Sequence, residues 1–102
     1  MKIVWTGPAL SDVQSIRDYI ARDSAVYAAR FVRRLIRSTR ILKRSPEIGA
    51  VVPEFQDQGV REILFGNYRI FYRSRAERVR VIAVIHAARD LGSLRRESWD
   101  LS

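Results

Sequence analysis

Three strand-like segments follow one another between Val60 and Leu91, and they constrain the fold more than any other feature of the chain. Val60–Phe65 and Tyr68–Ser74 alternate apolar and polar residues, and the intervening Gly66-Asn67 is a typical two-residue hairpin turn. A second, polar turn leads into Val79–Ala88, a long run rich in β-branched residues. We therefore predict an antiparallel meander with Val79–Ala88 as its central strand.

The Gly66-Asn67 turn assigns the side chains of the first two strands to the two faces of the sheet. Opposed residues share a face, so one face receives the pairs Phe65 with Tyr68, Ile63 with Ile70, and Arg61 with Tyr72. This face is apolar except at its Arg61 end and should meet the core. The opposite face mixes arginines and apolar residues in a way that suits a partner: Glu62, Leu64, Arg69, Phe71 and Arg73. We expect His86 on this second face, with Arg69, unless a β-bulge reverses the alternation.

The segments before the meander predict one strand and two helices. Lys2–Trp5 is a short strand with Ile3 and Trp5 on one face, and it could pair at either side of the meander. Helical spacing of apolar residues predicts helices over about 8–22 and 24–44, with Asp12 facing outward from the first. Their very short connection predicts an antiparallel hairpin. Residues 47–59 are predicted to be a loop.

The predicted order is β-α-α-β-β-β, an α+β fold in a single domain over residues 1–102. The helical hairpin (about 8–44) packs on one face of a small, mostly antiparallel sheet (about 60–88), and a tail (89–102) follows. No element is left to cover the opposite sheet face.

The charge of the chain points to an anionic partner. Lys and Arg number 19 against 11 Asp and Glu, which gives a net charge of +8, and 17 of the 19 are arginine. Arginine recognises phosphate and carboxylate groups through several donors at once, so nucleic acid and an acidic protein are both plausible partners. Seven cations fall on the second predicted helix with no acid among them: Arg30, Arg33, Arg34, Arg37, Arg40, Lys43 and Arg44.

Several classes of site and location are disfavoured by the composition. The chain has no cysteine, one histidine and no carboxylate cluster at ligand spacing, so we expect neither disulfides nor a metal, and no cofactor. The five glycines are scattered and form no phosphate-binding loop. No run has the length and apolarity of a signal peptide or a membrane span, so we expect a cytoplasmic protein without membrane association.

Four motifs in this order resemble the RelE/ParE superfamily of bacterial toxins from toxin–antitoxin pairs. They are Pro46-Glu47-Ile48-Gly49, Val60-Arg61-Glu62-Ile63, Asn67-Tyr68-Arg69-Ile70-Phe71-Tyr72-Arg73 and Val84-Ile85-His86-Ala87-Ala88-Arg89-Asp90-Leu91. The resemblance covers nearly the whole chain and implies a small toxin held inactive by an antitoxin. The last motif, and the Pro46–Pro53 loop leading into Val60, look more like the ParE branch, which poisons DNA gyrase. The alternative is the RelE branch, which cleaves messenger RNA on the ribosome.

Metal-independent RNA cleavage needs a base, an acid and cations near the phosphorus. His86 could supply the acid or base, and Arg69 and Arg61 could stabilise the phosphate, with Glu62 as another base. The lysines and late tyrosine common in RelE-like sites are absent here, which favours the ParE branch. Structural roles compete at each position, and Arg61 in particular could cap the sheet edge by bonding Glu62, Asp90 or a backbone carbonyl.

The resemblance to ParE implies a monomeric toxin that binds gyrase without catalysis. We expect target contacts from Arg61, Arg69, Arg73 and His86 and from the tail between Arg89 and Trp99. The antitoxin should be acidic and partly disordered when free, with one helix against the helical hairpin and an extended segment on the sheet. Its expected contacts on the second helix are Arg33, Arg37 and Arg40, although these charges could instead only keep that helix soluble.

Overall fold

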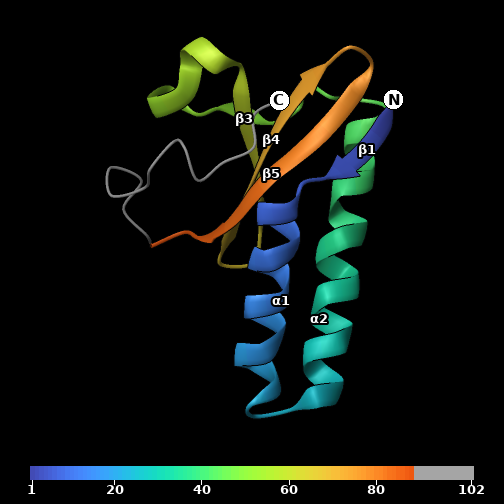
Figure 1. Cartoon of the computed structure of the whole chain (residues 1–102), viewed down its shortest axis with the longest axis vertical. Coiled ribbons are helices and arrows are strands. Elements are labelled where there is room, and N and C mark those ends of the chain that lie inside the picture. Colours follow the sequence, from blue (N-terminus) through green and yellow to red (C-terminus); the bar gives the residue numbers. More distant parts are fainter. Residues whose placement is uncertain (89–102) are drawn as a thin grey trace.

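A pair of antiparallel helices packs on one face of a mixed five-stranded sheet in the computed structural model, which describes residues 1–88 (Figure 1). The elements in chain order are β1 (Lys2–Trp5), α1 (Gly7–Ala21), α2 (Ala25–Ser38), the 3-10 helix η1 (Thr39–Lys43), β2 (Ala50–Val51), the 3-10 helix η2 (Pro53–Gln58), β3 (Val60–Phe65), β4 (Tyr68–Arg75) and β5 (Arg78–His86). The sheet order is β1-β5-β4-β3-β2, and only β1 and β5 run parallel. The predicted α+β class and helical hairpin are confirmed.

The register of β3 and β4 is the one that the Gly66-Asn67 turn predicts. Phe65 opposes Tyr68, Ile63 opposes Ile70, and Arg61 opposes Tyr72. Gly66 has a positive φ of 57°, the conformation that such a tight turn requires. β1 is the edge strand beside β5. Its Ile3 and Trp5 share one face, as predicted, and that face packs against the helices.

A bulge in β5 places His86 on the opposite face from the one expected. Phe71 opposes Ala83 while the next residue, Tyr72, opposes Val81, so β5 contains one extra residue between them. The alternation therefore reverses along the strand. His86 opposes Tyr68 on the helix-covered face, whereas Arg69 opposes Ile85 on the other face. The prediction that His86 and Arg69 share a face is wrong, because β5 contains the β-bulge that would reverse the alternation.

Side-chain hydroxyls cap both helices. Thr6 precedes α1 and accepts a hydrogen bond from the backbone N–H of Ala9, and Ser24 does the same for Tyr27 at the start of α2. The second predicted helix is divided, because regular α-helix ends at Ser38 and η1 completes the segment. At this junction, the hydroxyls of Ser38 and Thr39 donate to backbone carbonyls three residues earlier.

Both faces of the sheet bury apolar residues, so the expectation of an uncovered face is wrong. The helix side buries one cluster: Ala9, Val13, Leu35, Ile70, Val81 and Val84. The far side buries another: Val52, Phe55, Val60, Phe71, Ile82, Ala83 and Ile85. Val52 and Phe55 come from the segment predicted to be a loop, which instead forms β2 and η2 and lies over part of the far face.

Asp12 joins α1 to the sheet instead of facing outward as predicted. Its Oδ2 accepts a hydrogen bond of 2.9 Å from the backbone N–H of Val84, in β5 just beyond the bulge. The carboxylate therefore supplies an acceptor where the bulge disturbs the strand pairing.

Candidate functional site

The segment Pro46-Glu47-Ile48-Gly49, the first of the four motifs that carry the resemblance, packs against β3 and β4 through hydrogen bonds to Arg61 and Tyr72. The Gly49 N–H donates to the Tyr72 hydroxyl at 2.9 Å. Arg61 donates through Nη1 to the carbonyls of Gly49, at 2.8 Å, and Glu47, at 3.2 Å. Burial raises the pKa of Tyr72, while the hydrogen bond from Gly49 acts in the opposite direction. Arg61 therefore caps backbone carbonyls, one of the roles predicted for it.

Arg69 and Glu62 form an ion pair on the far face of the sheet. The Arg69 Nε donates to Glu62 Oε2 at 3.0 Å, and its Nη2 donates to the same oxygen. The guanidinium also lies 4.9 Å from the centre of the Phe71 ring. Because the two side chains are only 19% and 16% exposed, each largely neutralises the other away from water. In this arrangement, Arg69 is not a free phosphate ligand and Glu62 is not a free base.

His86 lies on the other side of the sheet, in an aromatic cluster. It is exposed, its ring meets Tyr68 edge-to-face at 5.4 Å, and Tyr68 in turn meets Phe31 at 5.8 Å. The His86 Nδ1 accepts a hydrogen bond from the Ala88 N–H at 3.2 Å, which places the proton of the neutral ring on Nε2. Burial, and secondarily the nearby Tyr19, raise the pKa of Tyr68.

The sheet therefore separates Arg69 from His86 and Arg61, the other two residues that a nuclease was predicted to use. His86 is on the helix face, Arg69 is on the far face, and Arg61 is held by the 47–49 segment. Arg73 lies beyond Arg69 on the far face and is buried, and burial together with the charge of Arg75 lowers its pKa. Arg89 and Trp99 lie outside the described residues.

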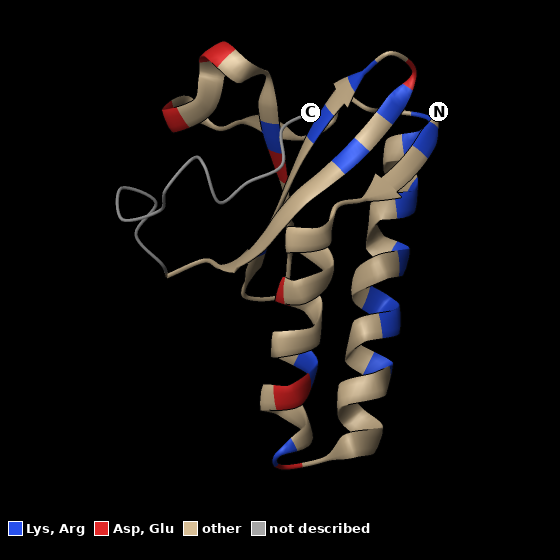
Figure 2. Cartoon of the chain, in the orientation of Figure 1, with Lys and Arg blue, Asp and Glu red and all other residues tan. Residues whose placement is uncertain are grey.

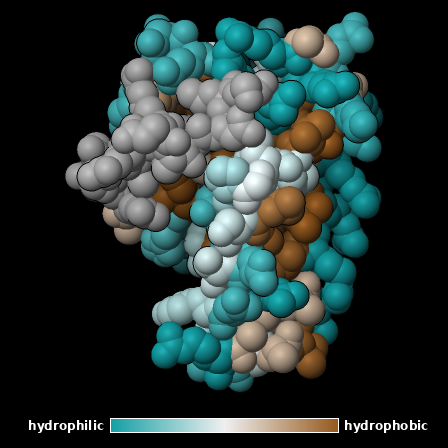
Figure 3. All heavy atoms as spheres, in the orientation of Figure 1, coloured by the Kyte–Doolittle hydropathy of each residue, from teal (hydrophilic) through white to brown (hydrophobic). Residues whose placement is uncertain are grey.

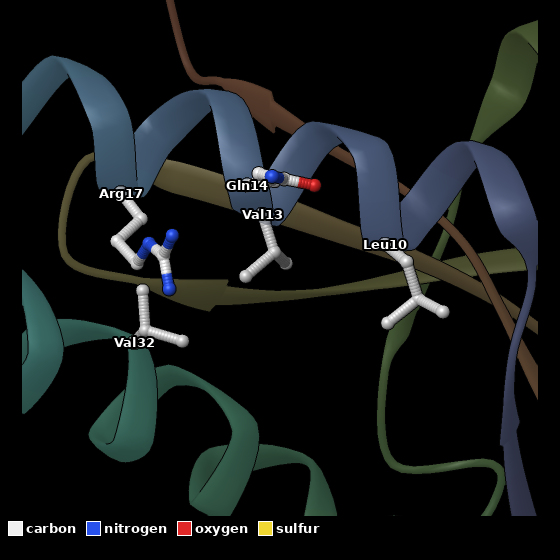
Figure 4. A pocket seen from close by; sticks show the side chains of 5 residues that line it. All are labelled: Leu10, Val13, Gln14, Arg17 and Val32. Carbon is white, nitrogen blue, oxygen red and sulfur yellow. The ribbon is translucent and has the colours of Figure 1, made fainter.

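A groove between α1 and α2, which the sequence reasoning missed, opens on the helical side. Figure 4 shows Leu10, Val13 and Arg17 of α1 pointing toward Val32 of α2, and Gln14 completes the lining of a space of about 320 Å³. Leu10, one of the apolar residues whose helical spacing predicts the first helix, is 53% exposed. Apolar side chains gather between the helices in Figure 3. The sequence signal for this groove was the set of apolar residues along the first helix, which form a stripe wider than the sheet can cover.

The arginines of α2 line the outer side of that helix. Arg33 and Arg37 of α2 and Arg40 of η1 are exposed, and none forms an ion pair with another residue of the described part of the chain. Figure 2 shows basic residues along α2 from its middle to its C-terminal end. The apolar groove is thus bordered by a strongly positive helix.

Residues 1–88 contain neither a cluster of side chains that could hold a metal ion nor a helix that could span a membrane. No three His, Cys, Asp or Glu side chains there lie close enough to hold a metal ion. Neither α1 nor α2 is long and apolar enough to cross a bilayer.

Comparison with known proteins defines the class. The fold matches a chain of a solved structure titled "Chromosomal ParDE TA system from P. aeruginosa", with a TM-score of 0.70 and 19% identity over 84% of this chain and 95% of that chain. The chain is also 34% identical over 89 residues to Toxin RelE2 of Caulobacter vibrioides (strain ATCC 19089 / CIP 103742 / CB 15), covering 86% of this chain and 97% of that toxin. The architecture is thus that of a small toxin of the RelE/ParE superfamily.

A family model described as "ParE toxin of type II toxin-antitoxin system, parDE" matches residues 3–91. The chain belongs to this family, and it is a toxin of a type II toxin–antitoxin system with an antitoxin as its partner.

Proposed function

We propose that this toxin acts in the cytoplasm as a ParE-like inhibitor of DNA gyrase, which it binds without catalysis of its own. The observation that carries the proposal is that Arg69 lies across the sheet from His86, while Arg69 and Arg61 each already have bonding partners. A ribonuclease must hold an acid, a base and a cation around one phosphate. Here Arg69 is paired with Glu62, and Arg61 is bonded to two backbone carbonyls. His86 lies across the sheet from both catalytic partners that it would need on the far face, Arg69 and Glu62.

The target contacts divide between two regions under this proposal. Arg69 and Arg73 contribute to the far face of the sheet, where Leu64, opposite Arg69 on β3, is 67% exposed and offers an apolar contact. His86 belongs to the other region, at the exposed end of β5 that leads toward Arg89 and Trp99. Arg61 acts indirectly, because it holds the 47–49 segment against β3.

The antitoxin binds the helical hairpin in this proposal. An amphipathic helix can place its apolar side chains in the Leu10–Val32 groove, as in other helix-in-groove complexes. Acidic residues at the edges of such a helix would then meet Arg33, Arg37 and Arg40. Charge complementarity of this kind mainly accelerates association and selects the partner.

A supercoiling assay tests the proposed target, with purified toxin, gyrase, relaxed plasmid and ATP. We expect the toxin to inhibit supercoiling and the antitoxin to restore it. The His86→Ala variant should still inhibit, with a half-inhibitory concentration raised by up to about tenfold, since it loses a contact and no catalytic group. Full gyrase activity in a large excess of toxin would contradict the proposal. Cleavage of messenger on translating ribosomes that disappears in His86→Ala and Arg69→Gln would then establish the RelE-like alternative.

A titration with the antitoxin tests the proposed helical interface. We expect Arg33→Glu, Arg37→Glu and Arg40→Glu together to weaken binding by at least about tenfold, mostly through slower association. Leu10→Asp should also weaken binding without affecting the fold, because Leu10 is already half exposed. Affinity that is unchanged in both variants would exclude this interface.

A further inference from the structure

Four cations gather at the end of the sheet that holds the β4–β5 turn: Lys2, Arg75, Arg78 and Arg80. We call them the basic rungs, because the strand register places them side by side. Arg75 opposes Arg78 across the turn, and Lys2 opposes Arg78 from β1. Arg80 opposes the buried Arg73 one rung further along. All lie on the far face of the sheet, opposite the helices, and Figure 2 shows basic residues at this end of β1, β4 and β5.

The arrangement is electrostatically unfavourable for the isolated toxin. Like charges directly opposite one another on neighbouring strands destabilise a sheet, and two such pairs occur among the rungs, Arg75 with Arg78 and Lys2 with Arg78. Burial, and secondarily the charge of Arg75, lower the pKa of the neighbouring Arg73. The side-chain carboxylate of Glu77, in the turn itself, is exposed and pairs with none of the rungs; only its backbone carbonyl accepts a bond, from the Lys2 N–H at 3.4 Å. None of the four rung side chains has a hydrogen bond or an ion pair within residues 1–88.

The chemistry around the rungs selects the type of anion. The exposed aromatic residues of the described chain, Tyr19 and Tyr27, belong to the helical hairpin, so the rungs have no platform on which unpaired bases could stack. The open apolar groove that an acidic peptide could use for anchors also lies on the helical side. The surface around the rungs is dominated by charge, with Met1, which is 42% exposed and contacts Ser74, as an apolar neighbour. Such a surface binds phosphates whose bases are already stacked within a duplex.

We propose that the basic rungs bind the phosphate backbone of duplex DNA, independently of base sequence. Neighbouring rungs are about 4.8 Å apart between strands and about 6.8 Å apart along a strand. This spacing lets adjacent guanidinium groups each reach a different phosphate oxygen. Gyrase inhibition does not depend on this site. None of the four rungs is among the residues proposed to contact the target or the antitoxin, although Arg80 lies opposite one of them, Arg73. A toxin that binds DNA weakly would be concentrated where both DNA and its enzymes are found.

Binding of the full-length toxin to a short fluorescent DNA duplex, measured by anisotropy at several salt concentrations, tests the proposal. If the four rungs neutralise four phosphates, the logarithm of affinity falls with that of salt with a slope of about −3.6, so that affinity falls about 150-fold between about 50 and about 200 mM salt. Removing two contacts in Arg75→Gln/Arg78→Gln should reduce the slope to about −1.8, or about 12-fold over the same range.

The matched control is Arg33→Gln/Arg37→Gln, which removes the same charge from α2. We expect it to leave the slope unchanged and to weaken antitoxin binding, whereas the rung variant should bind the antitoxin normally. Equal losses of DNA affinity in the two variants would reduce the effect to net charge and overturn the proposal. So would a single strand that binds as tightly as the duplex. Duplex RNA that binds more tightly than duplex DNA would overturn the choice of DNA.

The supercoiling assay distinguishes a loss of DNA binding from a loss of gyrase inhibition. A rung variant that has lost DNA binding should still inhibit gyrase when the enzyme is saturated with toxin. DNA binding that persists in a toxin with no effect on gyrase would refute the proposed function alone.

Discussion

Replacing Gly49 by alanine should destabilise the toxin strongly, because there is no room for a methyl group. A Cβ at this position would lie 2.6 Å from the Tyr72 hydroxyl, 2.6 Å from the carbonyl oxygen of Glu62 and 2.8 Å from Cε1 of Tyr72. One of these atoms belongs to the backbone of β3, which cannot move without disturbing its pairing with β2 and β4. The 47–49 segment must therefore shift away from the sheet.

The expected magnitude follows from the contacts that the shift would break. Overpacking of this kind costs about 1–3 kcal/mol. Loss of the hydrogen bond from Gly49 to Tyr72 adds about 1 kcal/mol, and weakening of the charged bond from Arg61 to Gly49 adds a comparable amount. A total of about 3 kcal/mol lowers the Tm of a domain of this size by about 12–24 °C.

Thermal and urea unfolding followed by circular dichroism measure the effect. Gly7→Ala is the matched control, since a Cβ at Gly7 would meet nothing within 4 Å and should leave Tm nearly unchanged. Adding Tyr72→Phe to Gly49→Ala removes the hydroxyl, one of the two shortest contacts. The loss of unfolding free energy in the double variant should therefore be about 1 kcal/mol smaller than the sum of the losses in the two single variants. A Tm for Gly49→Ala equal to that of Gly7→Ala, or strictly additive effects, would refute the steric reasoning.

Three further predictions follow from single contacts. Burial raises the pKa of Tyr72 above that of an unfolded tyrosine, so the folded state keeps its proton longer. The contribution of Tyr72 to stability should be constant below about pH 10 and fall above it by up to about 1.4 kcal/mol per pH unit, and urea unfolding of Tyr72→Phe should show a smaller decline above about pH 10. Glu62→Gln leaves Arg69 without its counter-ion and should lower the free energy of unfolding, measured in urea, by about 2 kcal/mol. Adding Arg69→Gln should restore part of that loss. If the losses of the two single variants instead add up in the double variant, the two residues are not coupled. Asp12→Ala removes the acceptor for the Val84 N–H and should cost about 1.5–3 kcal/mol, while Asp12→Asn should cost less, so equal losses in melting experiments would contradict the bond.

The sequence suggested residue types for function but not their arrangement in space. The sequence pointed to Arg61, Arg69 and His86 through the residue types that phosphate chemistry needs. The structure places Arg69 beside Glu62 and gives Arg61 the carbonyls of Glu47 and Gly49. Neither pairing of Arg69 nor docking of residues 47–49 could be deduced from spacing, because the partners come from separate elements that meet only in the folded chain.

The sequence by itself determined the two α-helices, the long strands and the register of one hairpin, but not β2, η1 and η2. Hydrophobic periodicity set α1, α2 and the three long strands, and Gly66-Asn67 set the pairing of β3 with β4, because a two-residue turn permits only one register. Tertiary structure alone decided the parallel pairing of β1, the cover supplied by Val52 and Phe55, and the bulge that moves His86 to the helix face. In β5, apolar residues occupy both faces through the bulge, so alternation carries no signal there. The choice between registers is made by packing against both layers at once, which a strand considered alone cannot reveal.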